Sequence, residues 1–331
     1  SNSSSSSNSN FLIKFFKKMT RFFLRIIWGL IWRTSLIIFL GITSAVSYYY
    51  FNMKEFSSFL DERARGSVTL EDYKGEVFAW RGDNFSKNLT AENISPHLKN
   101  AILATEDRGF YSHVGISPRG IGSAVFINLR EGRGPLSGHG GSTITQQTAK
   151  LVCLGKPFSQ ADWNSEKDYE ASCRTSTIWR KIKEALYALS LEFKFSKDEI
   201  LTIYINRVFL GAGTRGFEAA AQRYFGKSAK IVNPSEAAML AGLLKAPTRY
   251  APTNNLKRSQ ERANLIIGLM ENQNFLSKAE AKFARENPAT LSKFAQAKAG
   301  GYFADWVMAS LPDYLTYETT EDVEVIIFQK T

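Results

Sequence analysis

The sequence predicts a mainly helical protein, with one membrane-spanning helix near its N-terminus and a short β-containing segment after that helix. Residues 34–53 carry no charged side chain, and twenty helical residues span about 30 Å, enough to cross a bilayer core. From residue 95 onward, helix-start signals followed by periodic apolar residues recur along the chain. The length of 331 residues allows one large domain or two modest ones.

The positive charge of the chain is concentrated beside the apolar run. The formal net charge is +11, and residues 1–53 hold six cations and no acid. These cations are Lys14, Lys17, Lys18, Arg21, Arg25 and Arg33. Because all six precede residue 34, the positive-inside rule predicts a cytoplasmic N-terminus, and residues 1–33 are expected to be disordered and basic. A cleaved signal peptide is the alternative, disfavoured by the long apolar stretch and the absence of a clear A-x-A site.

A stalk is predicted for residues 54–94. Two short β-like runs, Ser67–Leu70 and Glu76–Trp80, are separated by a Lys-Gly pair and closed by Arg-Gly-Asp, a pattern typical of a small hairpin. Near the C-terminus, residues 318–328 are rich in β-branched side chains and predict one further strand. We therefore expect residues 311–331 to begin a linker that leaves the helical body.

Residues 95–310 are predicted to form that helical body. Ser95-Pro96, the capping box that begins at Ser196, and Asn233-Pro234 each mark a helix start. Residues 256–300 predict two further helices. Two cysteines are too few for a disulfide framework or a four-thiolate zinc site, and three histidines without metal-ligand spacing make a zinc site improbable.

Three clusters in the body carry polar groups suited to chemistry. Residues 106–113 combine two adjacent carboxylates, a cation, an aromatic ring and a histidine, although composition alone favours a solvated helix end. Residues 138–150 combine glycines, which let backbone N–H groups approach a ligand, with hydroxyls and amides; the alternative is a glycine-rich turn before a helix. No Walker lysine follows these glycines.

The third cluster is Arg180-Lys181-x-x-Glu184. On a helix, Glu184 would share a face with Arg180 at i,i+4 and meet Lys181 at i,i+3. Taken alone, this pattern is usually a surface ion pair.

In their order, the clusters resemble the signature of the peptidoglycan glycosyltransferases of family 51, which carry E-D-x-x-F-x-x-H-x-G, then G-G-S-T-x-T-Q-Q-x-x-K, then R-K-x-x-E. Residues 200–211 and 236–252 resemble the fourth and fifth motifs of that family. The resemblance covers residues 66–310. The sequence resembles both the monofunctional enzymes and the N-terminal part of class A penicillin-binding proteins. Among these, it looks like the alphaproteobacterial versions. This resemblance implies a lysozyme-like helical head with a membrane-associated jaw.

The resemblance implies that the chain polymerises lipid II into glycan strands by inverting glycosyl transfer from an undecaprenyl-pyrophosphate donor to the C4 hydroxyl of an acceptor. Glu106 matches the general base, and Glu184 matches a second glutamate that would orient cations or ligate a divalent metal. The residues implied to bind substrate or pyrophosphate are Asp107, Phe110, His113, Ser142, Thr143, Gln147, Lys150, Arg180, Lys181 and Asn206. Among them, Phe110 is expected to pack and His113 to orient the loop. The alternative for Glu106 is a structural cap or an ion pair with Arg108.

The resemblance also implies partners and a location. The partners are lipid II, the growing glycan strand, the lipid bilayer and other cell-wall synthesis proteins, with no nucleic acid. Mg²⁺ or Mn²⁺ is the expected cofactor, and no organic cofactor is expected. The chain would be a single-pass protein of the bacterial inner membrane, with its catalytic domain outside the cytoplasm.

The chain departs from the family pattern around Lys150. Leu151 stands where many members have asparagine, and the longer stretch that follows contains Cys153 and Cys173. Outside the cytoplasm, a Cys153–Cys173 disulfide would stiffen a loop beside the donor site and contribute about 3 kcal/mol. Two free, buried thiols are the alternative.

Other interpretations stay open at this point. Residues 115–135 fit either a buried amphipathic helix or an interfacial jaw. No S-x-x-K occurs, so the chain is expected to be monofunctional or an N-terminal fragment of a bifunctional enzyme. A lysozyme-like hydrolase or lytic transglycosylase is the competing enzyme. A membrane-anchored scaffold without activity is the non-enzymatic alternative.

Overall fold

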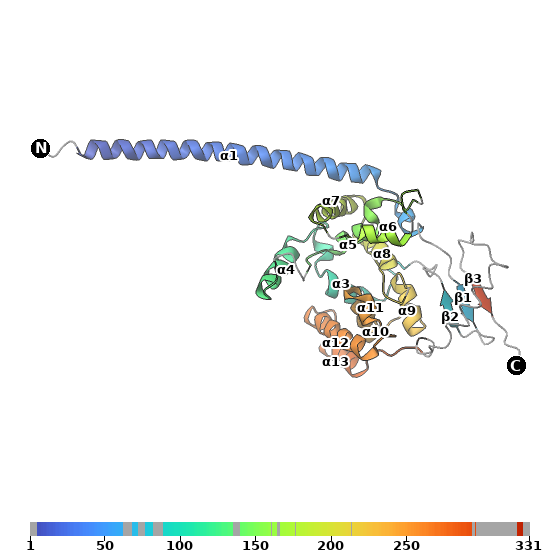
Figure 1. Cartoon of the computed structure of the whole chain (residues 1–331). Helices are drawn as coiled ribbons and strands as arrows, with labels where there is room; N and C mark the ends of the chain where they lie inside the picture. The colour runs from blue at the N-terminus through green and yellow to red at the C-terminus, as the bar shows by residue number, and fades with distance from the viewer. Residues whose placement is uncertain are drawn as a thin grey trace, which may run out of the picture. The chain divides into compact units, whose positions relative to one another are not determined.

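The computed structural model describes residues 5–61, 68–71, 77–81, 89–134, 140–159, 161–163, 166–175, 177–212, 214–292, 295 and 323–326. The chain divides into two compact units, Ser1–Asn52 and Met53–Thr331. Helices dominate the described residues of both units (Figure 1), which confirms the predicted mainly helical class. The predicted end of the helical body, residue 310, lies outside the described residues.

The first unit contains one helix, α1 (Ser5–Asn52). Its segment Lys17–Asn52 is long and apolar enough to cross a membrane, with a mean hydropathy of 1.8 over its most apolar part. The helix also covers residues 5–33, so the predicted disorder of this segment is wrong. The apolar run continues upstream of residue 34 and no proline interrupts it, so nothing in the sequence ends the helix there.

A three-stranded sheet joins two distant parts of the second unit. The expected hairpin is present as β1 (Val68–Glu71) antiparallel to β2 (Val77–Arg81). The expected C-terminal strand is β3 (Val323–Ile326), and it pairs in parallel with β1, so the order is β2-β1-β3 (Figure 1). The predicted stalk and the predicted linker therefore share one sheet instead of being separate segments.

Twelve further helices and three short 3₁₀ turns are present in the described part of the second unit. The helices are α2 (Phe56–Asp61), α3 (Pro96–Glu106), α4 (Pro118–Arg130), α5 (Ile144–Leu151), α6 (Glu166–Cys173), α7 (Ile178–Lys194), α8 (Lys197–Arg207), α9 (Phe217–Phe225), α10 (Pro234–Gly242), α11 (Pro247–Tyr250), α12 (Leu256–Asn272) and α13 (Lys278–Glu286). The turns are η1 (Phe110–Ser112), η2 (Cys153–Gly155) and η3 (Leu243–Lys245).

Helix starts follow the predicted signals with one difference. Ser196 and Asn233 each form a complete capping box with the glutamate three residues later. Ser95 precedes Pro96 as expected, but its hydroxyl caps no helix and donates instead to the carbonyl of Val232 at 2.8 Å. This bond fixes the start of α3 against the segment that leads into α10.

The buried core holds α3 and α5, the helices that carry site residues, in place. Helix α10 is buried along nearly its whole length and packs against α3 and α12. Helix α5 packs against α7 and α8, and Ile203 and Tyr204 of α8 are fully buried. The end of α3 is also bound to α12, because the Gln273 side chain donates to the Ala104 carbonyl at 3.1 Å. The C-terminal end of α3 is therefore held on two sides.

Candidate active site

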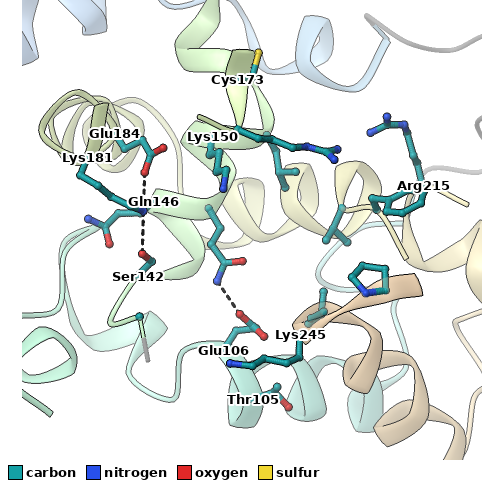
Figure 2. Close-up of a pocket in the computed structure, with 18 of the residues that line it drawn as sticks. Thr105, Glu106, Ser142, Gln146, Lys150, Cys173, Lys181, Glu184, Arg215 and Lys245 are labelled. Carbon is teal, nitrogen blue, oxygen red and sulfur yellow. Dashed lines mark hydrogen bonds and ion pairs between the residues drawn. The ribbon is translucent and has the colours of Figure 1, made fainter. Parts of the chain in front are cut away.

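A cavity of about 1170 Å³ is lined by residues from α3, α5, α7, η3 and α12 (Figure 2). It brings together six of the residues predicted to be catalytic or substrate-binding. These six are Glu106, Ser142, Gln147, Lys150, Lys181 and Glu184. Residues that are far apart in the sequence therefore share one cavity.

Glu106 is the last residue of α3 and is held by an amide. Its Oε2 accepts a hydrogen bond from Gln147 Nε2 at 2.7 Å, and the Tyr204 hydroxyl donates to Gln147 Oε1 at 3.4 Å. Burial raises the pKa of Glu106 above its ordinary value of 4.5, while the Gln147 bond and the charges of Arg262 and Lys245 oppose the rise. A carboxylate with a raised pKa is suited to accept a proton near neutral pH.

A second carboxylate, Glu184, lies at the centre of a group of cations. Its side chain is almost fully buried, its Oε1 accepts from Arg180 Nε at 3.0 Å, and its Oε2 accepts from Lys181 Nζ at 2.9 Å. Both pairs follow the i,i+4 and i,i+3 spacing predicted from the sequence. Figure 2 shows Lys181 bonded to both Glu184 and Ser142.

Lys150 adds a further cation to this group. Burial lowers the pKa of Lys150; Glu184 opposes the shift, and repulsion from Lys181, Arg180 and Arg174 adds to it. Lys150, Arg174, Arg180 and Lys181 therefore form one cation group with a single carboxylate, Glu184, among them. This excess of positive charge suits an anionic ligand such as a phosphate.

Three further cations line the cavity and were given no role from the sequence, and two of them, Lys245 and Arg262, act on the charge of Glu106. They are Lys245, the last residue of η3, and Arg215 and Arg262. Lys245 lies within the fifth motif, and nothing else in the sequence indicated that it belongs to the site. Arg262 carries no local signal, because its approach depends on the packing of α12 against α10. A β-carbon at Gly242 would lie 3.0 Å from Arg262 Cγ, so the glycine leaves room for this approach.

Asp107, His113 and Phe110 do not line the cavity. Asp107 is buried, and its Oδ2 accepts from the backbone N–H of Ile144 at 3.1 Å. Both of its oxygens lie 3.0 Å from His113 Nε2. Phe110 is fully buried, with the Lys197 ammonium 4.5 Å from its ring. Asp107, itself bonded to His113, thus fixes the start of α5, which carries Gln147 and Lys150.

Thr143, Arg180 and Asn206 also lie outside the cavity lining. The Thr143 hydroxyl accepts from the N–H of Gln146 in a capping box and donates to the Gly115 carbonyl at 2.5 Å. The Asn206 side chain binds both the N–H and the carbonyl of Leu89, at 3.1 and 2.7 Å. These side chains hold backbone in place. Their direct contact with substrate stays a prediction, and Gly138 and His139 of the glycine-rich cluster lie outside the described residues.

The two cysteines are joined and lie at the cavity wall. Cys153 in η2 is bonded to Cys173, the last residue of α6, with 5.2 Å between their Cα atoms. Both residues line the cavity beside the cation group.

Helix α4 presents apolar side chains to the outside. Ile121, Phe126 and Leu129 are exposed, whereas Ala124 and Asn128 are its buried residues. Only a narrow stripe of α4 is therefore buried, and the simple buried-helix interpretation of residues 115–135 does not hold. Insertion of this helix into a membrane stays a prediction.

The predicted divalent cation would need side chains that can ligate it. Among the described residues, no group of three or more His, Cys, Asp or Glu side chains could hold a metal ion. Each oxygen of Glu184, the predicted ligand, already accepts from a cation. In this arrangement both Glu184 oxygens are occupied, and binding of a divalent cation at Glu184 stays a prediction.

Comparison with known proteins gives one family. A family model described as Transglycosylase matches residues 74–271. Penicillin-binding protein 1A of Aquifex aeolicus is 38% identical over 71% of this chain and 30% of its own length. Penicillin-binding protein 1A of Haemophilus influenzae is 40% identical over 66% of this chain and 23% of its own length. The crystal structure of penicillin-binding protein 1A from Haemophilus influenzae covers 80% of this chain and 26% of that chain, with 23% identity and a TM-score of 0.43. The chain spans less than a third of the length of these relatives.

Proposed function

The chain belongs to the transglycosylase family, and from this premise we propose that it polymerises lipid II into peptidoglycan glycan strands. One observation carries the proposal: Glu106, a carboxylate with a raised pKa, lines the same cavity as Lys150, Arg174 and Lys181, three of the cations around Glu184 (Figure 2). Glycosyl transfer from a lipid pyrophosphate needs both, a base for the attacking hydroxyl and positive charge for the leaving group.

Glu106 is the base in this proposal. The C4 oxygen of the acceptor sugar attacks the anomeric carbon of the donor, the bond from that carbon to the pyrophosphate oxygen breaks, and the hydroxyl proton passes to Glu106. A single displacement inverts the anomeric configuration. Gln147 supports this role, because its bond to Oε2 fixes the carboxylate and leaves Oε1 for the acceptor hydroxyl.

The cation group receives the departing pyrophosphate. The side chain of Lys181 is 51% exposed, so its ammonium can reach a ligand while it remains bonded to Glu184. Lys150 lies on the same side of the cavity. Glu184 holds the cations in position by its two hydrogen bonds, and Ser142, which contacts Lys181 at 3.3 Å, adds a hydroxyl for sugar or phosphate oxygens.

The lipid tail of the donor requires a bilayer, and two features of the chain support one as a partner. Lys17–Asn52 is apolar enough to act as an anchor, and the exposed apolar side chains of α4 suit a membrane interface. The proposed location is the bacterial inner membrane, with a cytoplasmic N-terminus and the cavity on the far side. Other cell-wall synthesis proteins are part of the same proposal.

The test is polymerisation of labelled lipid II by the detergent-solubilised chain, with products resolved by size. We expect a ladder of glycan strands. Lys181→Ala should reduce the rate by about tenfold or more, because it removes a charge-assisted contact. Lys183→Ala is the matched control on the same helix: the Lys183 ammonium lies 5.7 Å from the Trp179 ring and outside the cavity lining. It should retain the parental rate.

Two results would contradict the proposal. Cleavage of preformed glycan without any ladder would indicate a hydrolase. An equal loss of polymerisation rate in Lys181→Ala and Lys183→Ala would show that the reaction does not depend on the cation group.

A further inference from the structure

We infer that the Cys153–Cys173 disulfide positions the electropositive side of the cavity for its anionic ligand, and that it acts through Arg180. This inference rests on the proposed function, since it takes a diphosphate group as the ligand of that side. It makes the two cysteines positioning residues for substrate binding.

The link from the disulfide to Arg180 is a backbone carbonyl. Cys173 ends α6, and the carbonyl of its neighbour Ser172 accepts from Arg180 Nη1 at 2.7 Å. Arg180 Nε donates to Glu184 at 3.0 Å. The guanidinium therefore bridges the last turn of α6 and the central carboxylate of the cation group. Its position depends on where α6 ends.

The Arg180 guanidinium is held by its bonds at Nη1 and Nε, and the state of its third nitrogen, Nη2, supports this. The side chain is 15% exposed, and Nη2 is buried without a hydrogen-bond partner among the described residues. A buried donor without a partner costs free energy, so the two bonds at Nη1 and Nε must hold the guanidinium where it lies. Loss of the Ser172 carbonyl would leave one bond to do so.

Helix α6 is attached to its surroundings through a small buried cluster. Cys153, Cys173 and Tyr169 form this cluster, and Phe158 and Trp163 pack against it. The Tyr169 ring lies 5.7 and 5.9 Å from those of Phe158 and Trp163. Because the cluster is small, the covalent bond at its centre is a major restraint on the end of α6.

The other end of the disulfide is fixed independently. The φ angles of Cys153, Leu154 and Gly155 are +50°, +56° and +77°, a left-handed run that only glycine adopts without steric cost. A β-carbon at Gly155 would lie 2.7 Å from the hydroxyl of Tyr187, which is fully buried on α7. The η2 turn is thus packed directly against α7. Because the disulfide joins this turn to Cys173, it restrains the end of α6 relative to α7.

The expected consequence of breaking the bond is weaker anion binding. Without the disulfide, the end of α6 can move, and the Ser172 carbonyl no longer holds Arg180 in a fixed position. Arg174 directly follows Cys173 and lines the cavity, so its backbone would also be less restrained. We expect the affinity for inorganic pyrophosphate to fall about tenfold, the effect of one charge-assisted hydrogen bond. The turnover number should change little, because Glu106 lies on α3.

The test is a double-mutant cycle, read by titration calorimetry with inorganic pyrophosphate on the full chain. The variants are Cys153→Ser/Cys173→Ser, Arg180→Ala and their combination. The serine pair should weaken binding about tenfold in the parent and have no further effect in the Arg180→Ala background. Equal weakening in both backgrounds, or no weakening in the parent, would overturn the inference.

Reduction of the folded parent gives a second route that needs no variant. Dithiothreitol converts the bond to two thiols and itself becomes a cyclic disulfide. The reduced chain should match the serine pair in affinity, with unchanged helical circular dichroism, and reoxidation should restore binding. Arg180→Lys keeps the charge but not the two-sided contact, so reduction should not affect its affinity. Persistent redox sensitivity in Arg180→Lys would contradict a role through Arg180.

Lipid II kinetics on the same samples separate this inference from the proposed function. Reduction should raise KM and leave kcat nearly unchanged. A parent chain that binds pyrophosphate in a redox-dependent manner but makes no glycan would contradict the proposed function and support the positioning role. A chain that polymerises lipid II equally well in both redox states, with equal KM, would support the function and overturn the inference.

Discussion

Replacing Glu184 by glutamine removes the negative charge from the centre of the cation group. Glu184 is 2% exposed and accepts one charge-assisted hydrogen bond at each oxygen. Glutamine keeps one acceptor oxygen, so one of the two cations loses its partner. Arg180 is 15% exposed and loses the most, whereas the 51% exposed Lys181 is solvated and contributes less than about 1 kcal/mol. We therefore expect a loss of about 2 kcal/mol in the free energy of unfolding.

Urea unfolding of parent and variant measures this loss as a shift in midpoint at constant slope. A matched control is Glu184→Gln/Lys181→Met, which also removes one of the cations that repel each other. It should recover part of the stability without recovering polymerisation. A variant within about 0.5 kcal/mol of the parent, the range of ordinary surface substitutions, would refute the claim that Glu184 holds the cations together.

Three further predictions concern the base and its support. Gln147→Leu removes a donor that lowers the pKa of Glu106, so the acid limb of the kcat/KM profile should move to higher pH; an unmoved limb would contradict the Gln147 contact. Because folding raises the pKa of Glu106, the folded state binds more protons than the unfolded state and stability falls as pH rises above 4.5. Glu106→Gln should therefore gain stability relative to the parent as the pH rises above 4.5, by about 1.4 kcal/mol per unit of pKa shift in urea unfolding; a difference that does not change with pH would count against the raised pKa. Asp107→Ala leaves the Ile144 N–H without its partner, so thermal unfolding should show a loss of about 2 kcal/mol, and an unchanged Tm would contradict that role.

Much of the fold could be predicted from local sequence patterns, because the interactions that these patterns encode join residues close together in the chain. The capping boxes at Ser196 and Asn233 and the ion pairs of Glu184 each involve residues within four positions of one another. Helix geometry alone fixes such contacts. Ser95 shows the limit of this reasoning, because the partner of its hydroxyl is the distant Val232 carbonyl.

The site was only partly predictable for the same reason. Motif residues near Glu106 are polar, but the sequence does not say which of them face the cavity. Asp107 and Thr143 turn out to hold backbone groups, whereas Lys245 and Arg262 line the cavity. Only the packing of α10 and α12 brings Arg262 to the cavity wall, and no short-range pattern encodes that packing.

The central claim is that Glu106 acts as the base while the cation group separately binds the diphosphate. The most direct test measures two quantities on Glu106→Gln: the single-turnover rate of glycosidic bond formation at saturating lipid II, and the affinity for inorganic pyrophosphate. We predict that the rate falls about 100-fold or more, as expected for loss of a general base, while the pyrophosphate affinity stays within about twofold of the parent, since Glu184 and its cations are intact. A preserved rate, or equal losses of rate and affinity, would contradict this division of roles.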